Sequence, residues 1–156
     1  MIRIRIPGVP PSANHAYFNL PHGRRGLTKE GQRYKNETKS FIAQKHPTAM
    51  GMFQPNEEYT VVFQFTVLPE DFYTSTFGKK GGSTAKLKKW DISNRVKLLE
   101  DAFKDATSID DSCTTVLVVR KVPGDRAFTT IMAWASEREV DPLTEILEQY
   151  NPSEEL

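Results

Sequence analysis

The segment from residue 91 to residue 106 constrains the fold most, because its apolar residues recur at intervals of three and four. This period is typical of an amphipathic helix that turns one face towards a core. The apolar positions are Ile92, Val96, Leu99, Phe103 and Ala106. At about 100° per residue, the opposite side of this helix holds Asp91, Asn94, Leu98 and Asp101. The sequence therefore predicts a helix with one buried apolar stripe and a polar face built around acids.

Four further segments have the period or the composition of β-strands. In residues 2–6 isoleucine alternates with arginine, which is the pattern of a strand with one buried face. The other three segments are rich in β-branched and aromatic residues: 59–67, 114–122 and 128–135. The Pro-Gly-Asp-Arg sequence at residues 123–126 is typical of a hairpin-type connection, so we expect the last two strands to pair.

Two more helices and two long loops complete the expected architecture. Residues 29–45 have a helix-forming composition with Thr28 as N-cap, and residues 141–150 begin with an Asp-Pro pair that suits a helix start. Residues 14–26 and 70–90 are expected to be surface loops, because they are rich in loop-forming residues and show no clear period. We expect an α+β fold in which a small mixed, partly antiparallel sheet packs against two main helices, with a short C-terminal helix added.

Length and composition favour a single domain over residues 1–156, since a domain commonly takes about 100 to 200 residues. The apolar stretches are far shorter than the ~20 residues needed to cross a bilayer, so no membrane span is expected. The start of the chain lacks the apolar run of a signal peptide and the chain has one cysteine, so we expect a cytoplasmic protein. Without a glycine-rich phosphate loop or a Cys and His cluster, no organic cofactor is expected.

Charge is distributed unevenly along the chain. Residues 137–156 carry seven acids against one arginine, a net −6, so residues 1–136 carry +7 of a chain whose formal net charge is +1. A basic body with an acidic tail is compatible with a polyanionic partner, because lysine and arginine release counterions from a phosphate backbone. Many soluble domains carry such asymmetry as a solvated face, so charge alone does not identify the partner.

Acids before and after the long helix are the candidate catalytic residues. Asp91 precedes the helix, and Asp110 and Asp111 follow it where the chain turns into the next strand. If the turn brings the pair back beside the helix start, the converging carboxylates would hold a divalent cation, and hard oxygen ligands favour Mg²⁺ or Mn²⁺. Such a metal activates water, and Lys97 would add positive charge at the transition state. The alternative is structural, because Asp91 is a natural N-cap and an Asp-Asp pair is a common turn.

In order and spacing, these motifs resemble those of the RusA-type Holliday-junction resolvases. The family pattern is an Asp, a hydrophobic residue, an Asp and an Asn, then a Lys three residues on, an Asp-Ala-hydrophobic triplet, and an Asp-Asp pair that opens a strand. The matching residues are Asp91-Ile92-Ser93-Asn94, Lys97, Asp101-Ala102-Phe103 and Asp110-Asp111-Ser112. Residues 10–15 and 27–31 also look like family elements, so the resemblance covers roughly residues 1 to 121.

The resemblance implies a function, a metal and an assembly. The implied function is a metal-dependent endonuclease that resolves Holliday junctions and other branched DNA by paired phosphodiester hydrolysis, in recombination and repair. It implies that Asp91, Asp110 and Asp111 bind Mg²⁺, with Mn²⁺ as a substitute, and that Lys97 is catalytic. Because these junctions have two-fold symmetry and paired nicks require two active sites, it also implies a homodimer. Family members occur in phages, prophages and bacteria.

Ser93 departs from the family pattern, because it stands where the family has its second Asp. A neutral hydroxyl is a poor ligand for a hard cation compared with a carboxylate. The alternative function is therefore a catalytically weak or inactive accessory protein of the same fold that binds branched DNA. A third hypothesis is a small-molecule phosphoesterase, which would use similar acids without needing a DNA-binding loop.

Basic and polar residues upstream of the helix are the candidate DNA-binding residues. Five lysines with no acid among them lie within the eleven residues before Trp90: Lys79, Lys80, Lys86, Lys88 and Lys89. Asn14 and His15 match a family motif, and Arg24 and Arg25 add positive charge. Cations beside the acids would deliver the phosphate to them. A loop rich in lysine and glycine is also typical of plain solvated surface, so each lysine alone is weak evidence.

Overall fold

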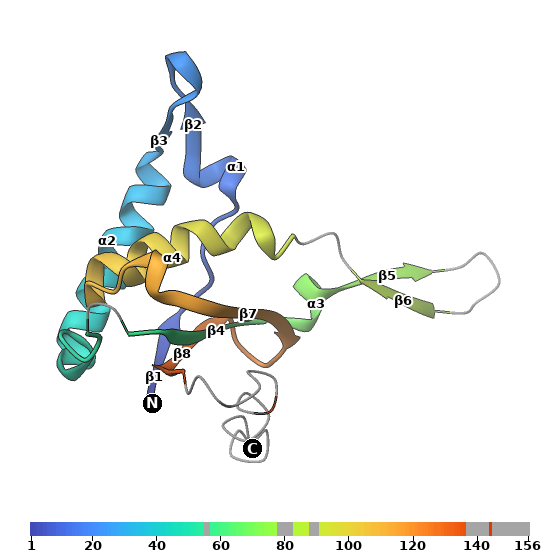
Figure 1. Cartoon of the computed structure of the whole chain (residues 1–156). Coiled ribbons are helices and arrows are strands. Elements are labelled where there is room, and N and C mark those ends of the chain that lie inside the picture. Colours follow the sequence, from blue (N-terminus) through green and yellow to red (C-terminus); the bar gives the residue numbers. More distant parts are fainter. Residues whose placement is uncertain (55–56, 78–82, 88–90, 137–143, 145–156) are drawn as a thin grey trace.

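The computed structural model describes residues 1–54, 57–77, 83–87, 91–136 and 144 (Figure 1). Its centre is a four-stranded sheet in the order β1-β8-β4-β7. The strands are β1 (Ile2–Pro7), β4 (Tyr59–Val67), β7 (Thr114–Pro123) and β8 (Phe128–Ala135). β8 pairs antiparallel with both β1 and β4, whereas β4 and β7 run parallel. The expected mixed, partly antiparallel sheet is confirmed.

Strand β4 decides the strand order. All nine of its residues are buried, whereas β1 alternates buried and exposed residues as its sequence period predicts. A strand that is buried on both faces belongs in the middle of a sheet. β4 therefore lies between β7 and β8, and the hairpin expected at residues 123–126 is wrong. The turn there is held to β4 instead, since the backbone N–H of Gly124 donates to the carbonyl oxygen of Val67 (2.8 Å).

The two main helices are α2 (Lys29–Lys45) and α4 (Ser93–Thr107), and both lie on one side of the sheet in Figure 1. They share a core cluster with the strands, to which α2 contributes Ile42 and α4 contributes Leu99 and Phe103. The predicted N-cap of α2 is confirmed, because Thr28 Oγ1 accepts the backbone N–H of Gly31 (3.1 Å). The expected packing of a sheet against two helices is thus also confirmed.

Helix α4 is buried on a second side that its apolar stripe does not predict. Leu98, which the helical period assigns to the polar face, is 1% exposed, and Ala102 is fully buried. One turn further along that side, Asp105 pairs with Lys35 of α2 (Oδ2 to Nζ, 2.9 Å). The expected polar side is therefore wrong at Leu98, because α4 packs there against α2 as well as against the sheet.

The two expected loops contain hairpins. Residues 14–26 lie largely in a short helix α1 (Ala13–Ala16), strand β2 (Tyr17–Asn19), the 3-10 turn η1 (Pro21–Gly23) and strand β3 (Arg25–Leu27), with β2 and β3 antiparallel. Residues 70–90 include part of α3 (Pro69–Phe72) and the antiparallel strands β5 (Tyr73–Phe77) and β6 (Ser83–Leu87). The expectation of irregular loops is wrong here, because a hairpin pairs its own backbone groups and needs no apolar period.

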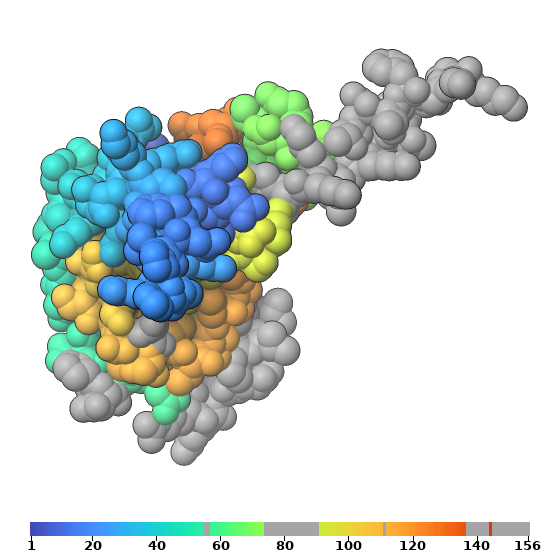
Figure 2. All heavy atoms as spheres, turned by 90° about the horizontal axis from the view of Figure 1, so that it is seen from above, coloured from blue at the N-terminus to red at the C-terminus, as the bar shows by residue number. Residues whose placement is uncertain are grey.

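Both hairpins project from the body of the molecule (Figure 1). From above, the β2–β3 arm stands over the helical face (Figure 2). In Figure 1, α3 lies at the base of the second arm. The remaining elements are two 3-10 turns, η2 (Pro47–Ala49) and η3 (Asp111–Cys113).

The expected C-terminal helix at residues 141–150 and the acidic tail at residues 137–156 lie outside the described residues, apart from Thr144. Within the part of the chain that the structure describes, no helix is long and apolar enough to span a membrane. A single domain over the whole chain stays a prediction.

Candidate active site

Asp91 lies just before α4 and is held by the residues that open the helix. Its Oδ1 accepts hydrogen bonds from the hydroxyl and the backbone N–H of Ser93 (2.6 and 3.0 Å), and its Oδ2 accepts one from Asn94 Nδ2 (2.8 Å). The bond to the backbone satisfies one of the first N–H groups of the helix, as an N-cap does. The structural role considered for Asp91 is therefore present, and the carboxylate is also held in one orientation.

The hydrogen bonds favour the ionised form of Asp91. The hydroxyl of Ser93 is the main cause that lowers the pKa of this carboxyl below its ordinary value, and the backbone N–H groups of Ser93 and Asn94 add to it. Hydrogen bonds donated to a carboxylate favour its charged form. Asp91 is thus an exposed, oriented negative charge at neutral pH, which is what a cation ligand requires.

Asp91 opens onto a groove of about 690 Å³ between α4 and β7, here called the α4–β7 groove. Its lining residues are Asp91, Ile92, Ser93, Val96, Lys97, Glu100, Leu117 and Val119. The groove brings the expected catalytic Lys97 to the same cavity as Asp91, together with one further acid. Glu100 was not anticipated, although its spacing of three residues from Lys97 places it on the same side of the helix.

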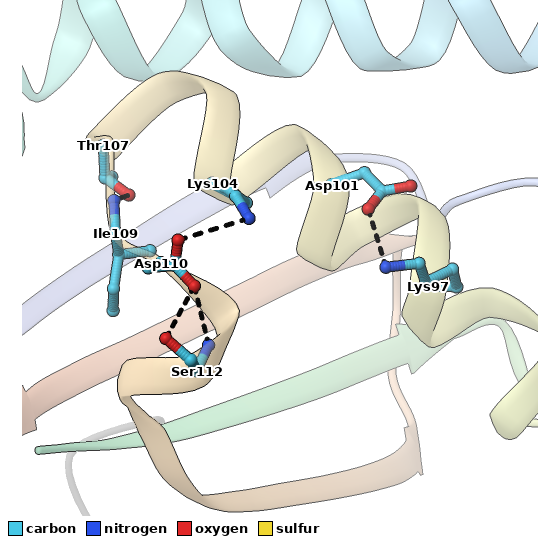
Figure 3. Close-up of polar contacts among 7 residues, drawn as sticks. All are labelled: Lys97, Asp101, Lys104, Thr107, Ile109, Asp110 and Ser112. Atoms are coloured by element: carbon cyan, nitrogen blue, oxygen red, sulfur yellow. Dashed lines mark hydrogen bonds and ion pairs between the residues drawn. The ribbon is translucent and has the colours of Figure 1, made fainter.

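Lys97 is held by Asp101, as Figure 3 shows. Lys97 Nζ lies 2.9 Å from Asp101 Oδ1, and the hydroxyl of Tyr17 donates to the other oxygen of Asp101 (3.2 Å). Burial and the neighbouring Asp101 raise the pKa of Tyr17 to about 12, so the phenol stays protonated and keeps donating. Asp101 therefore links the base of the β2–β3 arm to the lysine beside Asp91.

Asp110 lies at the other end of α4. Its Oδ1 accepts from the backbone N–H and the hydroxyl of Ser112 (2.9 and 2.8 Å), and its Oδ2 lies 3.8 Å from Lys104 Nζ. Figure 3 shows this cluster beside the last turns of α4, away from the Lys97–Asp101 pair. The expectation that the turn brings Asp110 back beside the helix start is wrong for a single chain, because β7 begins at the far end of α4 and only then runs back under it.

Part of the expected site falls outside what the structure describes. The backbone of Asp111 opens the turn η3, but its side chain is outside the described part, as is the side chain of Lys86 on β6. Lys79, Lys80, Lys88 and Lys89 also lie outside the described residues. Among the side chains that are described, no group of three His, Cys, Asp or Glu is placed to hold a metal ion.

The expected DNA-binding residues of the N-terminal region gather around the β2–β3 arm. Asn14 and His15 are exposed on α1, and Arg24 and Arg25 are exposed where the arm returns into β3. Asn14 and Arg25 line a pocket of about 300 Å³ together with Asn94 from α4. His15 lies in a separate cavity with Arg95. The structure therefore brings three of these positions close to the start of α4.

Tyr17 is a second candidate site residue that the sequence did not reveal. It is a single aromatic residue inside a stretch without period, and its hydrogen bond to Asp101 joins residues 84 positions apart in sequence. No local pattern predicts such a contact.

One comparison with known proteins identifies a family for this chain. The family model described as endodeoxyribonuclease RusA matches residues 7–133, which include both ends of α4, the whole of β4 and β7, most of β8 and only the last residue of β1. No curated protein matches the chain. Because the model spans most of the sequence, the chain belongs to the RusA endodeoxyribonuclease family.

Proposed function

We propose that this protein is a Mg²⁺-dependent endonuclease that resolves Holliday junctions and other branched DNA by paired phosphodiester hydrolysis. The observation that carries the proposal is the ionised, oriented carboxylate of Asp91 at the mouth of the α4–β7 groove, with Lys97 in the same cavity. Family membership makes DNA the substrate class. The setting we expect is recombination and repair in the cytoplasm of a bacterium, on host or phage DNA.

The donor atoms at Asp91 suit Mg²⁺ in kind but not in number. Carboxylate oxygens are the ligands that Mg²⁺ and Mn²⁺ prefer. Two of the hydrogen bonds to Asp91 come from Ser93, whose hydroxyl is a weak metal ligand. Asp91 shares the groove with Glu100, and the second acid expected nearby, Asp110, lies at the opposite end of the helix. A single chain, as far as it is described, does not supply a complete site.

A second copy of the chain supplies the missing acids in our proposal. A two-fold axis that sets two α4 helices antiparallel places the start of one helix beside the end of the other. Asp91 of one protomer would then meet the Asp110-Asp111 pair of its partner, and the dimer would have two identical sites. The exposed apolar Leu117, 38% exposed on the edge strand β7, suits burial in such an interface. Two sites related by symmetry also match the two nicks that resolution of a four-way junction requires.

The chain's own residues have distinct roles in this mechanism. A divalent cation bound beside Asp91 would lower the pKa of a water molecule there and would offset negative charge on the phosphate. Asp91 and the partner's acids hold the charge that the cation needs. Lys97 faces the phosphate from the same groove and stabilises its added negative charge, while Asp101 fixes the direction of the Lys97 side chain.

Ser93 supports a second candidate function, in which the protein binds branched DNA and cuts it weakly or not at all. Its hydroxyl occupies the position where the family pattern has a carboxylate, and it donates to Asp91 rather than adding a second negative charge. A small-molecule phosphoesterase is less favoured, because the two projecting arms and the open groove suit a large substrate.

A synthetic four-way junction separates these functions. Each of the four strands is labelled in turn and incubated with the protein in Mg²⁺ or in EDTA, and products are mapped at nucleotide resolution. The nuclease gives symmetric nicks in two opposing strands, only with the metal, and Asp91→Asn abolishes them. Asp125→Asn, which changes an exposed acid in the turn between β7 and β8, is the matched control and keeps wild-type rates. Metal-independent binding without nicks would instead support the accessory protein.

A further inference from the structure

A second pocket adjoins the candidate active site, between the β2–β3 arm and the start of α4. It has a volume of about 300 Å³, at the lower end of the range for small-molecule sites. Its main lining residues are Asn14, Tyr17, Phe18, Asn19, Arg25 and Asn94. The lining thus combines two aromatic rings, three amides and one guanidinium, and neither the metal site nor the family motifs account for Tyr17, Phe18 and Asn19.

Phe18 is held in place but left open on one side. It pairs with Gly26 across the hairpin, and a Cβ added to that glycine would lie only 2.6 Å from Phe18 Cζ. The ring therefore occupies the space that a side chain at position 26 would fill. An aromatic ring over a cross-strand glycine stabilises a short hairpin, and that role alone would favour burial. Phe18 as a whole is nevertheless 47% exposed, which leaves a face of the residue open to a ligand.

The amides and the guanidinium around Phe18 match the chemistry of a nucleotide. An amide side chain presents one donor and one acceptor group in a plane, which fits the edge of a nucleobase. Arg25 supplies a fixed positive charge that fits a phosphate. Aromatic rings bind unpaired bases by stacking, with little dependence on sequence.

Two hydrogen bonds connect the pocket to the candidate active site. Asn94 lines the pocket and donates to Asp91 Oδ2 (2.8 Å), while Tyr17 lines it and donates to Asp101, the partner of Lys97. A phosphate in the α4–β7 groove would therefore place a neighbouring base of the same strand at the pocket.

We infer that this pocket binds one unstacked nucleobase next to the cleaved phosphate, with Phe18 as the stacking surface. The inference rests on the proposed function and adds a reason for preferring branched DNA. A base at a branch point is already partly unstacked, so moving it into the pocket costs less than extracting a base from a continuous duplex.

The test compares the junction affinity of wild type and variants under conditions in which the DNA is not cleaved. Fluorescence anisotropy without divalent metal measures the affinity of wild type, Phe18→Ala, Phe18→Tyr and Leu20→Ala for a labelled four-way junction. Leu20 is exposed on the same arm but does not line the pocket, so it is the matched control. A second set of junctions carries one abasic site at each position near the branch in turn. Circular dichroism and thermal melting check that each variant is folded.

Phe18→Ala is expected to weaken junction binding by about 5- to 150-fold, the effect of losing one stacked base. Phe18→Tyr and Leu20→Ala should stay close to wild type. One abasic position should weaken binding of the wild type by a similar factor, and Phe18→Ala should add nothing further on that junction.

The possible outcomes distinguish a failure of the base pocket from a failure of the proposed function. If wild type binds and nicks the junction but neither Phe18→Ala nor any abasic site weakens binding, the base pocket is refuted and the nuclease stands. If Phe18→Ala is unfolded, the abasic scan with wild-type protein still decides. If wild type fails to bind the junction at all, the proposed function fails and the pocket assignment falls with it.

Discussion

The two-protomer site makes a prediction that a single-chain site does not share. The perturbation is a mixed dimer, in which one protomer carries Asp91→Asn and its partner carries both Asp110→Asn and Asp111→Asn. If each active site is shared between protomers, all three substitutions lie in the same one of the two active sites. The other site then keeps an intact Asp91 from one protomer and an intact pair from its partner.

The length of α4 determines how far apart Asp91 and Asp110 of one chain lie. Asp110 pairs with Lys104, eleven residues after Ser93, and a rise of 1.5 Å per residue puts these two positions about 16 Å apart along the helix. Oxygen ligands lie about 2.1 Å from Mg²⁺, so two carboxylate oxygens on one ion lie within about 4 Å of each other. Side chains of Asp are too short to close that gap, so Asp91 and Asp110 of one chain do not share an ion.

The assay uses two differently tagged variants that are co-expressed and purified through both tags, so that only mixed dimers remain. Each parent homodimer should be inactive on the four-way junction. The mixed dimer should nick at about half the wild-type rate, since one of two equivalent sites is intact. It should give single nicks and almost no paired cuts.

An inactive mixed dimer would refute this reasoning, because sites built within one chain would each carry a lesion. Full nicking by either parent homodimer would show instead that the substituted acids are not needed.

Three further predictions concern single side chains. Ser93→Asp adds a second carboxylate beside Asp91 and should lower the Mg²⁺ concentration for half-maximal cleavage by about tenfold, because ligand charge tunes affinity for divalent cations; a metal titration measures it. Asp101→Asn removes the ion pair that directs Lys97 and should lower kcat by about tenfold with little change in metal-free junction binding, since misplaced catalytic groups lose rate rather than affinity. Gly31→Ala places a Cβ 2.5 Å from a backbone oxygen of α1 and should destabilise the fold by about 1 to 3 kcal/mol in urea unfolding, despite the better helix propensity of alanine.

Two control variants carry comparable charge changes away from the candidate site. Ser40→Asp adds a carboxylate at an exposed position on α2 and should leave the metal requirement unchanged. Asp105→Asn breaks the pair with Lys35 and should leave kcat near wild type. An unchanged metal requirement in the Ser93 variant would remove Ser93 from the metal site. A Gly31→Ala variant as stable as wild type would show that α1 shifts without cost.

Period and composition were sufficient for the regular elements that build the core. The alternation of β1, the β-branched runs of β4, β7 and β8, and the capped helix α2 are local patterns, and each reflects which side of an element is buried. Helix α4 was also predictable, although the structure begins it at Ser93, two residues later than its period suggests. The acids, the lysine beside them and the family resemblance were likewise read directly from residue order.

Tertiary structure alone decided how these parts meet. The strand order places β4 between β7 and β8. A strand that is buried on both faces belongs at the centre of the sheet, and the turn sequence that joins β7 to β8 does not change this. The hairpins of residues 14–26 and 70–90 pair backbone groups and leave little trace in side-chain period. The sequence determined which acids this protein has, and the length of α4 decided that Asp91 and Asp110 stand at its opposite ends, because a helix is rigid and separates what the chain order places close together.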